Sequence, residues 1–446
     1  MREGSLEKPI RHPLGWREEE FYDEAALDRE MRRVFDICHG CRRCFNLCDS
    51  FPRLFDLADN SASGELDEVA SADFKPVVDA CTLCDLCFMT KCPYVPPHEF
   101  QLDFPHLMLR YRAVEHRKRE EKALVGQLAE TDRNGKLASF AAPLANWAAG
   151  PGVIQDMAKQ AIGVDPNAAL PRFCGRTLVT RAMEGGAPPV NSAAPAHGRK
   201  AVLYATCFAN YNNPTIGLAA RHVLARNGVE SEVVYPRCCG MPQLEKGDIA
   251  RVAEHAEEVV ATLLPYVEQG YDIVALVPSC ALMLKFEWPL ILPEHEGVKK
   301  LAEASFDISE YVVDIARHEG LAPGLAPLDG AMVVHIACHA RAQNMGQKAA
   351  ELLRLIPDQK LDVVERCSGH GGSWGVLKGN FETAIKVGRP VARAALASEA
   401  KYIVSECPLA GAHIAQGVEM LGGPRKPAPH PIELFARAYG YDEAAD

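Results

Sequence analysis

Six short apolar runs, rich in Val, Ile and Leu, occur in the second half of the chain, and each of them leads into a cysteine. Stretches with apolar residues at helical spacing separate successive runs. Short β-branched runs predict strands, and their alternation with helices predicts parallel sheets joined by right-handed crossovers. The runs occupy residues 201–207, 231–240, 272–280, 331–339, 361–369 and 401–407. The clearest helical stretches occupy residues 214–227, 248–268, 347–355 and 381–399.

The six runs form two sets of three, which indicates an internal repeat. In the first set Cys207 and Cys239 are 32 residues apart, and in the second Cys338 and Cys367 are 29 residues apart. The interval to the last cysteine is 41 residues in the first set and 40 residues in the second. Because ligands bind beyond the carboxyl ends of parallel strands, we expect the three cysteine positions of each set to converge in space.

The chain of 446 residues is long enough for several domains. Its first part holds two dense cysteine runs, flanked by charged, helix-like stretches at 24–36 and 104–124. An Ala-, Gly- and Pro-rich stretch follows and predicts a connecting segment, loosely structured or helical. We predict an α plus α/β fold, with a helical two-cluster ferredoxin-like domain followed by two pseudo-repeated α/β units with parallel sheets. The predicted boundaries are 1–125 for the helical domain, 126–197 for the connection, 198–328 for the first α/β unit, and 329–446 for the second unit with a C-terminal helix.

Charge and hydropathy exclude several classes of protein. The net charge of −11 argues against a nucleic-acid-binding surface, which needs concentrated basic charge. The sequence has no apolar run of the ~18 residues that a membrane-spanning helix requires, and residues 1–20 lack the apolar core of an export signal. We therefore expect a cytoplasmic protein that associates with a membrane only through a partner. No GxGxxG fingerprint follows a predicted strand, so we expect flavin or nicotinamide to be bound by a partner, if at all.

The chain has sixteen cysteines, and in a reducing compartment clustered cysteines are metal ligands or redox centres rather than disulfides. The first run reads Cys-x2-Cys-x2-Cys-x3-Cys over residues 38–48, and the second reads Cys-x2-Cys-x2-Cys-x4-Cys over residues 81–92. Such a triplet suits one face of a 4Fe–4S cubane, and in two-cluster ferredoxins the fourth cysteine binds the other cluster. Crossed ligation assigns Cys38, Cys41, Cys44 and Cys92 to one 4Fe–4S cluster, and Cys48, Cys81, Cys84 and Cys87 to a second.

The first repeated unit offers a further set of four thiolates, Cys207, Cys238, Cys239 and Cys280, at three predicted strand ends. Soft thiolates in such number favour a third iron–sulfur cluster over separate buried thiols. Adjacent cysteines need a distorted turn, and Gly240 permits one.

The pattern Cys207…Cys238-Cys239-Gly240…Cys280 resembles the CCG cysteine-rich domain. That domain is found in the B subunit of heterodisulfide reductase, in the C subunit of anaerobic glycerol-3-phosphate dehydrogenase, and in lactate-utilisation and glycolate oxidase subunits. The order of a two-cluster ferredoxin domain and two CCG units is similar to the glycerol-3-phosphate dehydrogenase subunit over most of the chain. In the heterodisulfide reductase branch, the resemblance implies non-cubane clusters that reduce a disulfide.

The sequence departs from the family pattern at three positions. Met283 and Ala410 stand where the final Cys-x2-Cys would place its second cysteine, and Ser368 stands in the second unit where the motif has Cys-Cys-Gly. Five-thiolate ligation is therefore unavailable in either unit. The second unit offers Cys338, Cys367 and Cys407 alone, so a cluster there needs a fourth ligand or leaves one iron open to substrate. His339 and His370 are the candidate fourth ligands, ahead of His335 and His413, although a lone histidine is more often a core or positioning residue.

Weaker signals are read as structural. Cys174 stands outside every cysteine group and is expected to be an ordinary buried thiol. His98 and His106 follow the second cysteine run, and we expect packing roles for both. The Gly-rich stretch 369–375 lacks the Lys-Ser/Thr of a phosphate loop, and we expect it to let backbone approach a cluster.

The resemblance implies an iron–sulfur electron-transfer subunit. It would relay electrons between a partner dehydrogenase or reductase and a quinone or another acceptor. A flavoprotein or a rubrerythrin-like protein is also an implied partner. One alternative is a catalytic reductase that acts on a substrate at a cluster in the CCG units. A second is a zinc-binding structural protein, which the cysteine spacing disfavours because zinc ribbons use Cys-x2-Cys pairs rather than triplets. Whether the chain is an enzyme by itself stays open.

Overall fold

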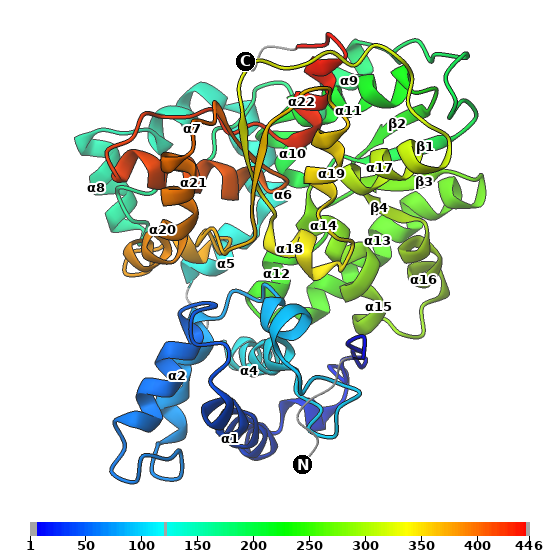
Figure 1. The fold of residues 1–446 in the computed structure, drawn as a ribbon. Helices are drawn as coiled ribbons and strands as arrows, with labels where there is room; N and C mark the ends of the chain where they lie inside the picture. Colours follow the sequence, from blue (N-terminus) through cyan, green and yellow to red (C-terminus); the bar gives the residue numbers. More distant parts are fainter. Residues whose placement is uncertain (1–6, 120–122, 443–446) are drawn as a thin grey trace.

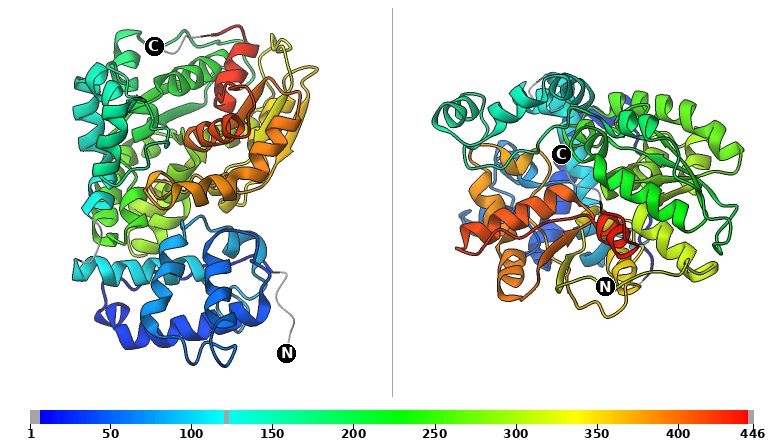
Figure 2. Two further views of the ribbon diagram at one scale, coloured as in Figure 1. Left: turned by 90° about the vertical axis from the view of Figure 1, so that its left-hand side faces the viewer. Right: turned by 90° about the horizontal axis from the view of Figure 1, so that it is seen from above.

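The computed structural model describes residues 7–119 and 123–442 of the chain (Figure 1). A helical N-terminal part lies below two α/β units, and a group of short helices lies along one side of both units (Figures 1 and 2). The prediction of a mixed fold with two parallel sheets is confirmed.

The N-terminal part packs around a cluster of phenylalanine rings, which includes Phe35, Phe51 and Phe104. Helix α1 begins where the side chain of Asp23 accepts a hydrogen bond from the amide of Ala26, and it runs further than the predicted 24–36. Helix α4 covers most of the predicted 104–124, of which residues 120–122 lie outside the described residues. The elements are η1 (Glu19–Tyr22), α1 (Glu24–Cys41), α2 (Ser50–Asp59), η2 (Ser71–Phe74), α3 (Lys75–Ala80), η3 (Cys87–Lys91) and α4 (Phe104–Lys118).

The first α/β unit is built on a four-stranded parallel sheet in the order β2-β1-β3-β4. The three predicted strands are β1 (Lys200–Tyr204), β2 (Glu230–Val234) and β3 (Asp272–Ala275). Strand β4 (Ser305–Asp307) was not predicted, because three residues are too few to show an alternation of apolar and polar positions. The helices of this unit are α10 (Cys207–Tyr211), α11 (Pro214–Arg226), α12 (Met241–Glu245), α13 (Ile249–Glu268), α14 (Pro278–Leu282), η4 (Met283–Glu287), α15 (Trp288–Ile291), α16 (Glu296–Glu303) and α17 (Ile308–His318).

The second unit is built on a three-stranded parallel sheet in the order β6-β5-β7. All three strands fall inside the predicted runs: β5 (Met332–His335), β6 (Leu361–Val364) and β7 (Tyr402–Ser405). The helices are α18 (Cys338–Ala342), α19 (Lys348–Arg354), η5 (Trp374–Val376), α20 (Phe381–Ala397), α21 (Pro408–Met420) and α22 (Pro431–Ala438).

The two sheets share one apolar core, which contains Leu203 and Val274 of the first sheet and Val334 and Val404 of the second. The C-terminal helix α22 crosses back to pack on α11 of the first unit (Figure 1). The carboxyl ends of the central strands β1 and β5 therefore stay fixed relative to each other.

The connecting segment is helical rather than loose. It contains α5 (Ala123–Ala129), α6 (Thr131–Phe140), α7 (Ala142–Ala149), α8 (Val153–Ala161) and α9 (Leu178–Glu184). Alanine has the highest helix propensity, and proline is well tolerated in the first turn, where Pro143 begins α7. Composition rich in Ala and Pro is thus compatible with helices that short loops interrupt.

Candidate functional site

The first thiol group consists of Cys38, Cys41, Cys44 and Cys92. Cys38 and Cys41 occupy the last turn of α1, and the left-handed backbone of Arg42 turns the chain toward Cys44. Burial, followed by the charges of Cys92, Cys44 and Cys41, raises the pKa of Cys38 well above its ordinary value. The four cysteines that crossed ligation grouped together therefore lie within electrostatic reach of one another.

The second thiol group consists of Cys48, Cys81, Cys84 and Cys87. Left-handed backbone at Leu83 and Asp85 curls the loop that carries the last three thiols. Burial, followed by the charges of Cys84 and Cys81, raises the pKa of Cys48 well above its ordinary value. The curl thus brings the second predicted set together as well. Arg112 supports it from α4 by donating hydrogen bonds to the carbonyls of Cys81 and Val78.

The third thiol group consists of Cys207, Cys238, Cys239 and Cys280, and it lies at the carboxyl ends of β1, β2 and β3. The Sγ atoms of Cys207 and Cys238 are 3.9 Å apart, and those of Cys239 and Cys280 are 3.3 Å apart. Gly240 has a φ of 88°, the left-handed conformation that the Cys-Cys-Gly turn was expected to need. Hydrogen bonds from the Cys207 and Cys239 thiols lower the pKa of Cys238 well below its ordinary value. The four thiols of this group are therefore in direct contact as two pairs, Cys207 with Cys238 and Cys239 with Cys280.

Two residues that the sequence did not single out hold the third thiol group. Asp132, in the first turn of α6, accepts hydrogen bonds from the amide of Cys238 at 3.0 Å and from the hydroxyl of Tyr235. Trp288 donates its indole N–H to the carbonyl of Cys239 at 3.0 Å. No sequence signal pointed to Asp132, because it lies about one hundred residues from the cysteines, in the connecting segment.

The fourth thiol group has three members, Cys338, Cys367 and Cys407. Burial, followed by the charges of Cys84, Cys367 and Cys407, raises the pKa of Cys338 well above its ordinary value. The amide of Gly369 donates a hydrogen bond to the sulfur of Cys367 at 3.3 Å. After burial, the largest contribution to the raised pKa of Cys338 thus comes from the charge of Cys84, a member of the second thiol group.

The candidate histidines differ in whether their ring nitrogens are free. In His339 one nitrogen contacts Ser279 Oγ at 2.8 Å and the other contacts the carbonyl of Leu83 at 3.4 Å. Both nitrogens of His335 are likewise hydrogen-bonded, to Ser405 Oγ and to the carbonyl of Arg366, each at 3.0 Å. These two side chains therefore position neighbouring segments and leave no nitrogen lone pair for a metal.

His370 and His413 are the other two candidates. The Nε2 atoms of both are buried and have no hydrogen-bond partner among the described residues. Burial, with the charge of His413, lowers the pKa of His370 to about 3, so its ring stays neutral. His370 therefore keeps a ring nitrogen available for a ligand, which His339 does not, and its ring lies 6.0 Å from that of His413 between centroids.

The four thiol groups are neighbours in space. Burial and then the charge of Cys367 raise the pKa of Cys84 to about 12, which links the second group to the fourth. Cys407 interacts electrostatically with Cys280, which links the fourth group to the third. Helix α18, which begins at Cys338, packs against both α14 and η3. After burial, the charges of neighbouring thiols, that of Cys44 among them, raise the pKa of Cys87, which links the first group to the second, so the thiols form a series from the N-terminal part to the first sheet.

The donor chemistry of the thiol groups fits iron–sulfur clusters, whose irons are held by cysteine thiolates. Within residues 7–119 and 123–442, no three His, Cys, Asp or Glu side chains meet around one point as a single ion requires. A cubane spreads its ligands over several corners, and iron neutralises the repulsion between buried thiolates that raises their pKa values.

A buried ionic cluster attaches the second cysteine loop to the first unit. Arg11 donates to Asp85 at 2.7 Å, to Asp103 at 2.9 Å and to Glu287 at 2.9 Å. His106, for which we expected a packing role, lies 3.1 Å from Glu287 and 3.2 Å from Asp103. Three carboxylates and two cations thus join α4, the cysteine loop and η4.

The Gly-rich stretch 369–375 lies close to the second cysteine loop. A Cβ atom at Gly371 would be 2.7 Å from Thr82 Cγ2, and one at Gly369 would be 2.0 Å from the carbonyl oxygen of Ala384. The glycines therefore let this backbone approach both α20 and the loop that carries Cys81 and Cys84.

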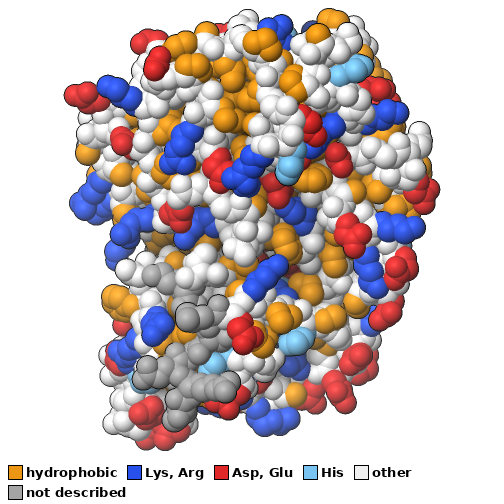
Figure 3. All heavy atoms as spheres, turned by 45° about the vertical axis from the view of Figure 1, so that its right-hand side comes forward, with side chains coloured by type: hydrophobic (Ala, Val, Ile, Leu, Met, Phe, Trp, Pro, Cys, Tyr) orange, Lys and Arg blue, Asp and Glu red, His pale blue; other side chains and the backbone are white. Residues whose placement is uncertain are grey.

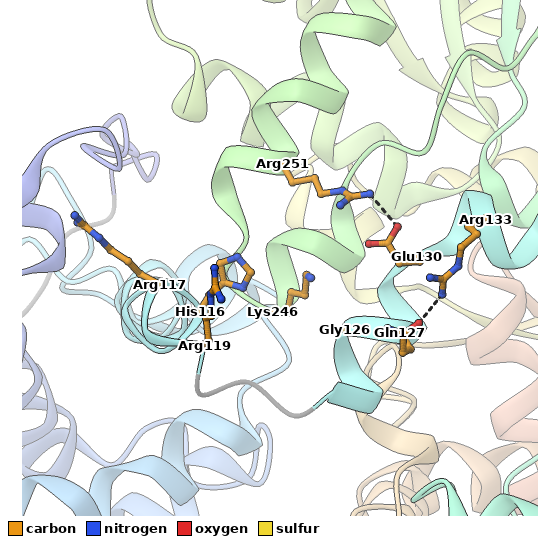
Figure 4. Close-up of a pocket in the computed structure, with 9 residues that line it drawn as sticks. All are labelled: His116, Arg117, Arg119, Gly126, Gln127, Glu130, Arg133, Lys246 and Arg251. Carbon is orange, nitrogen blue, oxygen red and sulfur yellow. Dashed lines mark hydrogen bonds and ion pairs between the residues drawn. The ribbon is translucent and has the colours of Figure 1, made fainter.

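A separate surface groove of about 800 Å³ lies away from the thiols (Figure 4). Its lining is basic, with Arg251 paired to Glu130 at 2.9 Å and Arg133 bonded to Gln127 at 2.7 Å. The lining residues are His116, Arg117, Arg119, Gly126, Gln127, Glu130, Arg133, Lys246 and Arg251. Across the described ranges, no helix combines the length and the apolar character needed to cross a bilayer.

Comparison with known proteins identifies both repeated units. The family model of the cysteine-rich CCG domain matches residues 201–285 and 332–415. The B subunit of the fumarate reductase (CoM/CoB) of Methanothermobacter marburgensis is 27% identical over 251 residues, which cover 55% of this chain and 47% of that protein. Lactate utilization protein A of Bacillus cytotoxicus is 27% identical over 187 residues, and that of Bacillus pumilus is 28% identical over 186 residues. These two matches cover 40% of this chain and 74% and 75% of the relatives. The chain thus spans about half the length of the fumarate reductase protein.

Proposed function

Because this chain is a CCG cysteine-rich domain protein that carries two copies of the domain, we propose that it is an iron–sulfur electron-transfer subunit of an oxidoreductase. In this role it relays electrons between a partner dehydrogenase or reductase and a quinone or another acceptor. The relatives are a subunit of a fumarate reductase and lactate utilization proteins, and we infer that this chain also works beside a partner protein.

The contiguity of the four thiol groups carries the proposal. The first and second groups would each hold a 4Fe–4S cluster on the crossed sets of cysteines, and the third group would hold a further cluster on four thiols. Bound clusters supply one-electron carriers. The links from Cys84 to Cys367 and from Cys407 to Cys280 then make a connected series instead of isolated sites.

We place the docking site of the redox partner at the first thiol group, where the loop after α1 faces solvent. Phe45 is exposed beside Cys44, and Arg42 and Arg43 are exposed on the same turn. An apolar side chain with flanking cations suits a partner with an acidic rim, such as a flavoprotein, a dehydrogenase or a rubrerythrin-like protein.

A catalytic reductase is the second candidate, and the fourth thiol group favours it. Three thiols leave one corner of a cubane without a cysteine, and the unpartnered Nε2 of His370 is the alternative donor that the second unit offers. If His370 does not fill that corner, an iron there is open to substrate. We propose the domain division 1–125, 126–197, 198–328 and 329–446 for both functions.

The test begins with anaerobic purification and assay of iron, acid-labile sulfide and zinc. We expect enough iron and sulfide for at least two 4Fe–4S clusters. Cys41→Ala should remove about four irons, the content of one cubane. Cys174→Ala is the matched control, because Cys174 lies outside all four thiol groups, and it should leave both counts unchanged. Stoichiometric zinc without sulfide would contradict the proposal.

The relay and the reductase are then separated with Cys338→Ala. In a relay, this variant should slow electron transfer from a reduced partner to the third thiol group, as seen by freeze-quench EPR. In a reductase, it should abolish a substrate-induced change in the EPR spectrum and leave reduction of the third group intact.

A further inference from the structure

Helix α8 has its apolar side toward solvent, the reverse of an ordinary surface helix. Val153 is 77% exposed, and Ile154, Met157 and Ile162 are also exposed along the same stripe. Lys159 of the same helix is instead turned inward, where it is 5% exposed and donates to the carbonyl of Pro166 at 3.3 Å. The stripe therefore has no intramolecular partner among the described residues.

The two preceding helices, α6 and α7, also carry exposed apolar side chains, and α7 contacts both α6 and α8. Phe140 is 94% exposed, and Leu137, Leu144 and Trp147 are exposed with it. Residues 137–155 contain no charged side chain, although 24% of the whole chain is charged. We define the apolar face as Leu137, Phe140, Leu144, Trp147, Val153, Ile154, Met157 and Ile162.

The apolar face differs from the rest of the surface. Helices α6 to α8 stand out from the side of the molecule in the view from above (Figure 2). On the face drawn in Figure 3, acidic and basic side chains are instead spread among the apolar ones. Monomeric soluble proteins rarely expose contiguous apolar patches of this kind, which mark protein or membrane contacts.

The charges that border the apolar face are mainly cationic. Arg133 and Lys136 are exposed on the same side of α6 as Leu137, and Arg133 also lines the basic groove (Figure 4). Arg172 is exposed next to Phe173, whose backbone is hydrogen-bonded to Asn146 of α7.

The two carboxylates of α6 and α8 each have a polar or cationic partner. Asp132 points inward to Tyr235 and Cys238, and Asp156 lies 3.8 Å from Lys159. An anionic surface would therefore meet attraction at the rim of the apolar face.

We propose that the apolar face binds the surface of a bilayer that contains anionic phospholipid. Short helices with exposed Trp, Phe and aliphatic side chains lie in the interface rather than across it, and neighbouring cations add attraction to anionic headgroups. A convex surface without charged side chains, bordered by cations, fits a lipid interface. It fits a protein–protein interface less well, because such interfaces have a polar rim. The proposal does not depend on electron transfer.

Membrane docking would bring the third thiol group close to the bilayer. Helix α6 rises about 1.5 Å per residue, so Asp132 and Phe140 are about 12 Å apart along its axis. Asp132 contacts Cys238 at one end of α6, and Phe140 belongs to the apolar face at the other.

Flotation of the full-length, cluster-loaded protein with lipid vesicles tests the proposal. We expect co-flotation with vesicles of phosphatidylcholine mixed with phosphatidylglycerol, and weaker co-flotation with phosphatidylcholine alone. The triple variant Phe140→Ser, Trp147→Ser and Ile154→Ser should lower binding at least about tenfold, because it removes most of the apolar area that inserts. Met183→Ser with Met420→Ser is the matched control, since both methionines are exposed and neither belongs to the apolar face, and binding should be unchanged.

The double variant Lys136→Gln with Arg172→Gln tests the cationic rim. It should weaken binding to the mixed vesicles and leave binding to phosphatidylcholine alone unchanged. Absence of wild-type co-flotation overturns the proposal, as does equal loss in the control. A dimer in analytical ultracentrifugation that the triple variant dissociates, without vesicle binding, would assign the apolar face to a second copy of the chain instead. Iron and sulfide counts on each variant show that the fold is intact.

Discussion

The two CCG units have the same scaffold but different chemistry at their strand ends. In the first, Gly240 with a φ of 88° follows two cysteines, and in the second, Gly369 with a φ of 80° follows Cys367 and Ser368. The same turn is therefore kept although one thiol is lost. The first unit closes its thiol group with Asp132 and Trp288, whereas the second places its thiols against Cys84 of the N-terminal part. Duplication thus conserved the backbone while the surroundings gave each copy its own neighbours.

Exchanging the residues that distinguish the two units should have the largest effect. Cys239→Ser gives the first unit the Cys-Ser-Gly turn of the second and leaves three thiols in the third group. We expect the EPR signal of a third cluster to change and up to about four irons to be lost, because the variant removes one of four cysteine ligands. The first and second thiol groups should keep their signals, which provides the internal control.

The reciprocal change, Ser368→Cys, gives the second unit the turn of the first. Ser368 is buried beside Cys367, so a thiol there should raise the iron content of the fourth group by up to about four. If the iron count is unchanged in this variant, and Cys239→Ser also changes neither the iron count nor the EPR spectrum, then neither unit binds a cluster through this turn.

The attachment of the first unit to the N-terminal part should be the next most sensitive feature. Arg11→Met leaves Asp85, Asp103 and Glu287 buried without their shared cation, and we expect a loss of about 3–5 kcal/mol in the free energy of unfolding. Anaerobic urea denaturation of the cluster-loaded protein measures it. Arg33→Met is the control, because Arg33 pairs with Glu30 at the surface of the same part, and it should cost less than about 1 kcal/mol.

Asp132→Ala tests whether the third thiol group depends on the connecting segment. The amide of Cys238 and the hydroxyl of Tyr235 lose their acceptor, and we expect a loss of about 1–3 kcal/mol. The EPR signal of the third group should shift while those of the first two stay in place. A uniform change in all signals would argue that Asp132 supports the whole fold rather than this site.

The smallest effect should be a pH dependence centred on His106. Burial and the charge of Arg11 lower the pKa of His106, but the charges of Asp103 and Glu287 outweigh them and raise it above 6.5. The stabilisation from charged His106 is therefore complete below pH 6.5 and is lost as the pH rises through the raised pKa. The pKa of Glu287 is lowered from 4.5, although burial alone would raise it, because His106 and Arg11 favour its charge. Its contribution is present above pH 4.5 and is lost as the pH falls through the lowered pKa.

His106→Gln should remove the alkaline part of this dependence and weaken the acid part, because the charge of His106 also lowers the pKa of Glu287. The midpoint of urea denaturation, measured across both pH windows, checks the expectation. A wild-type midpoint that does not change between pH 6.5 and the alkaline end of the native range would contradict it.

The sequence predicted the elements of the repeated units well and the connecting segment less well. All six apolar runs contain a strand, because β-branched runs between turn residues are a local signal. Strand β4 was missed because its three residues form a strand only by pairing with β3. In the connecting segment, Ala- and Pro-rich composition predicted helices and loops alike, and packing on both α/β units decided between them.

By itself, the sequence determined the grouping of the cysteines and the duplication, because spacing and periodicity are properties of short stretches of chain. Only the tertiary structure decided that Cys84 neighbours Cys367, that Cys407 neighbours Cys280, and that His339 uses both ring nitrogens. It also decided that Asp132 reaches Cys238 and that α8 has its apolar side outward. These contacts are between segments that are far apart in the chain. They form only when the domains pack together, so a local sequence pattern cannot predict them.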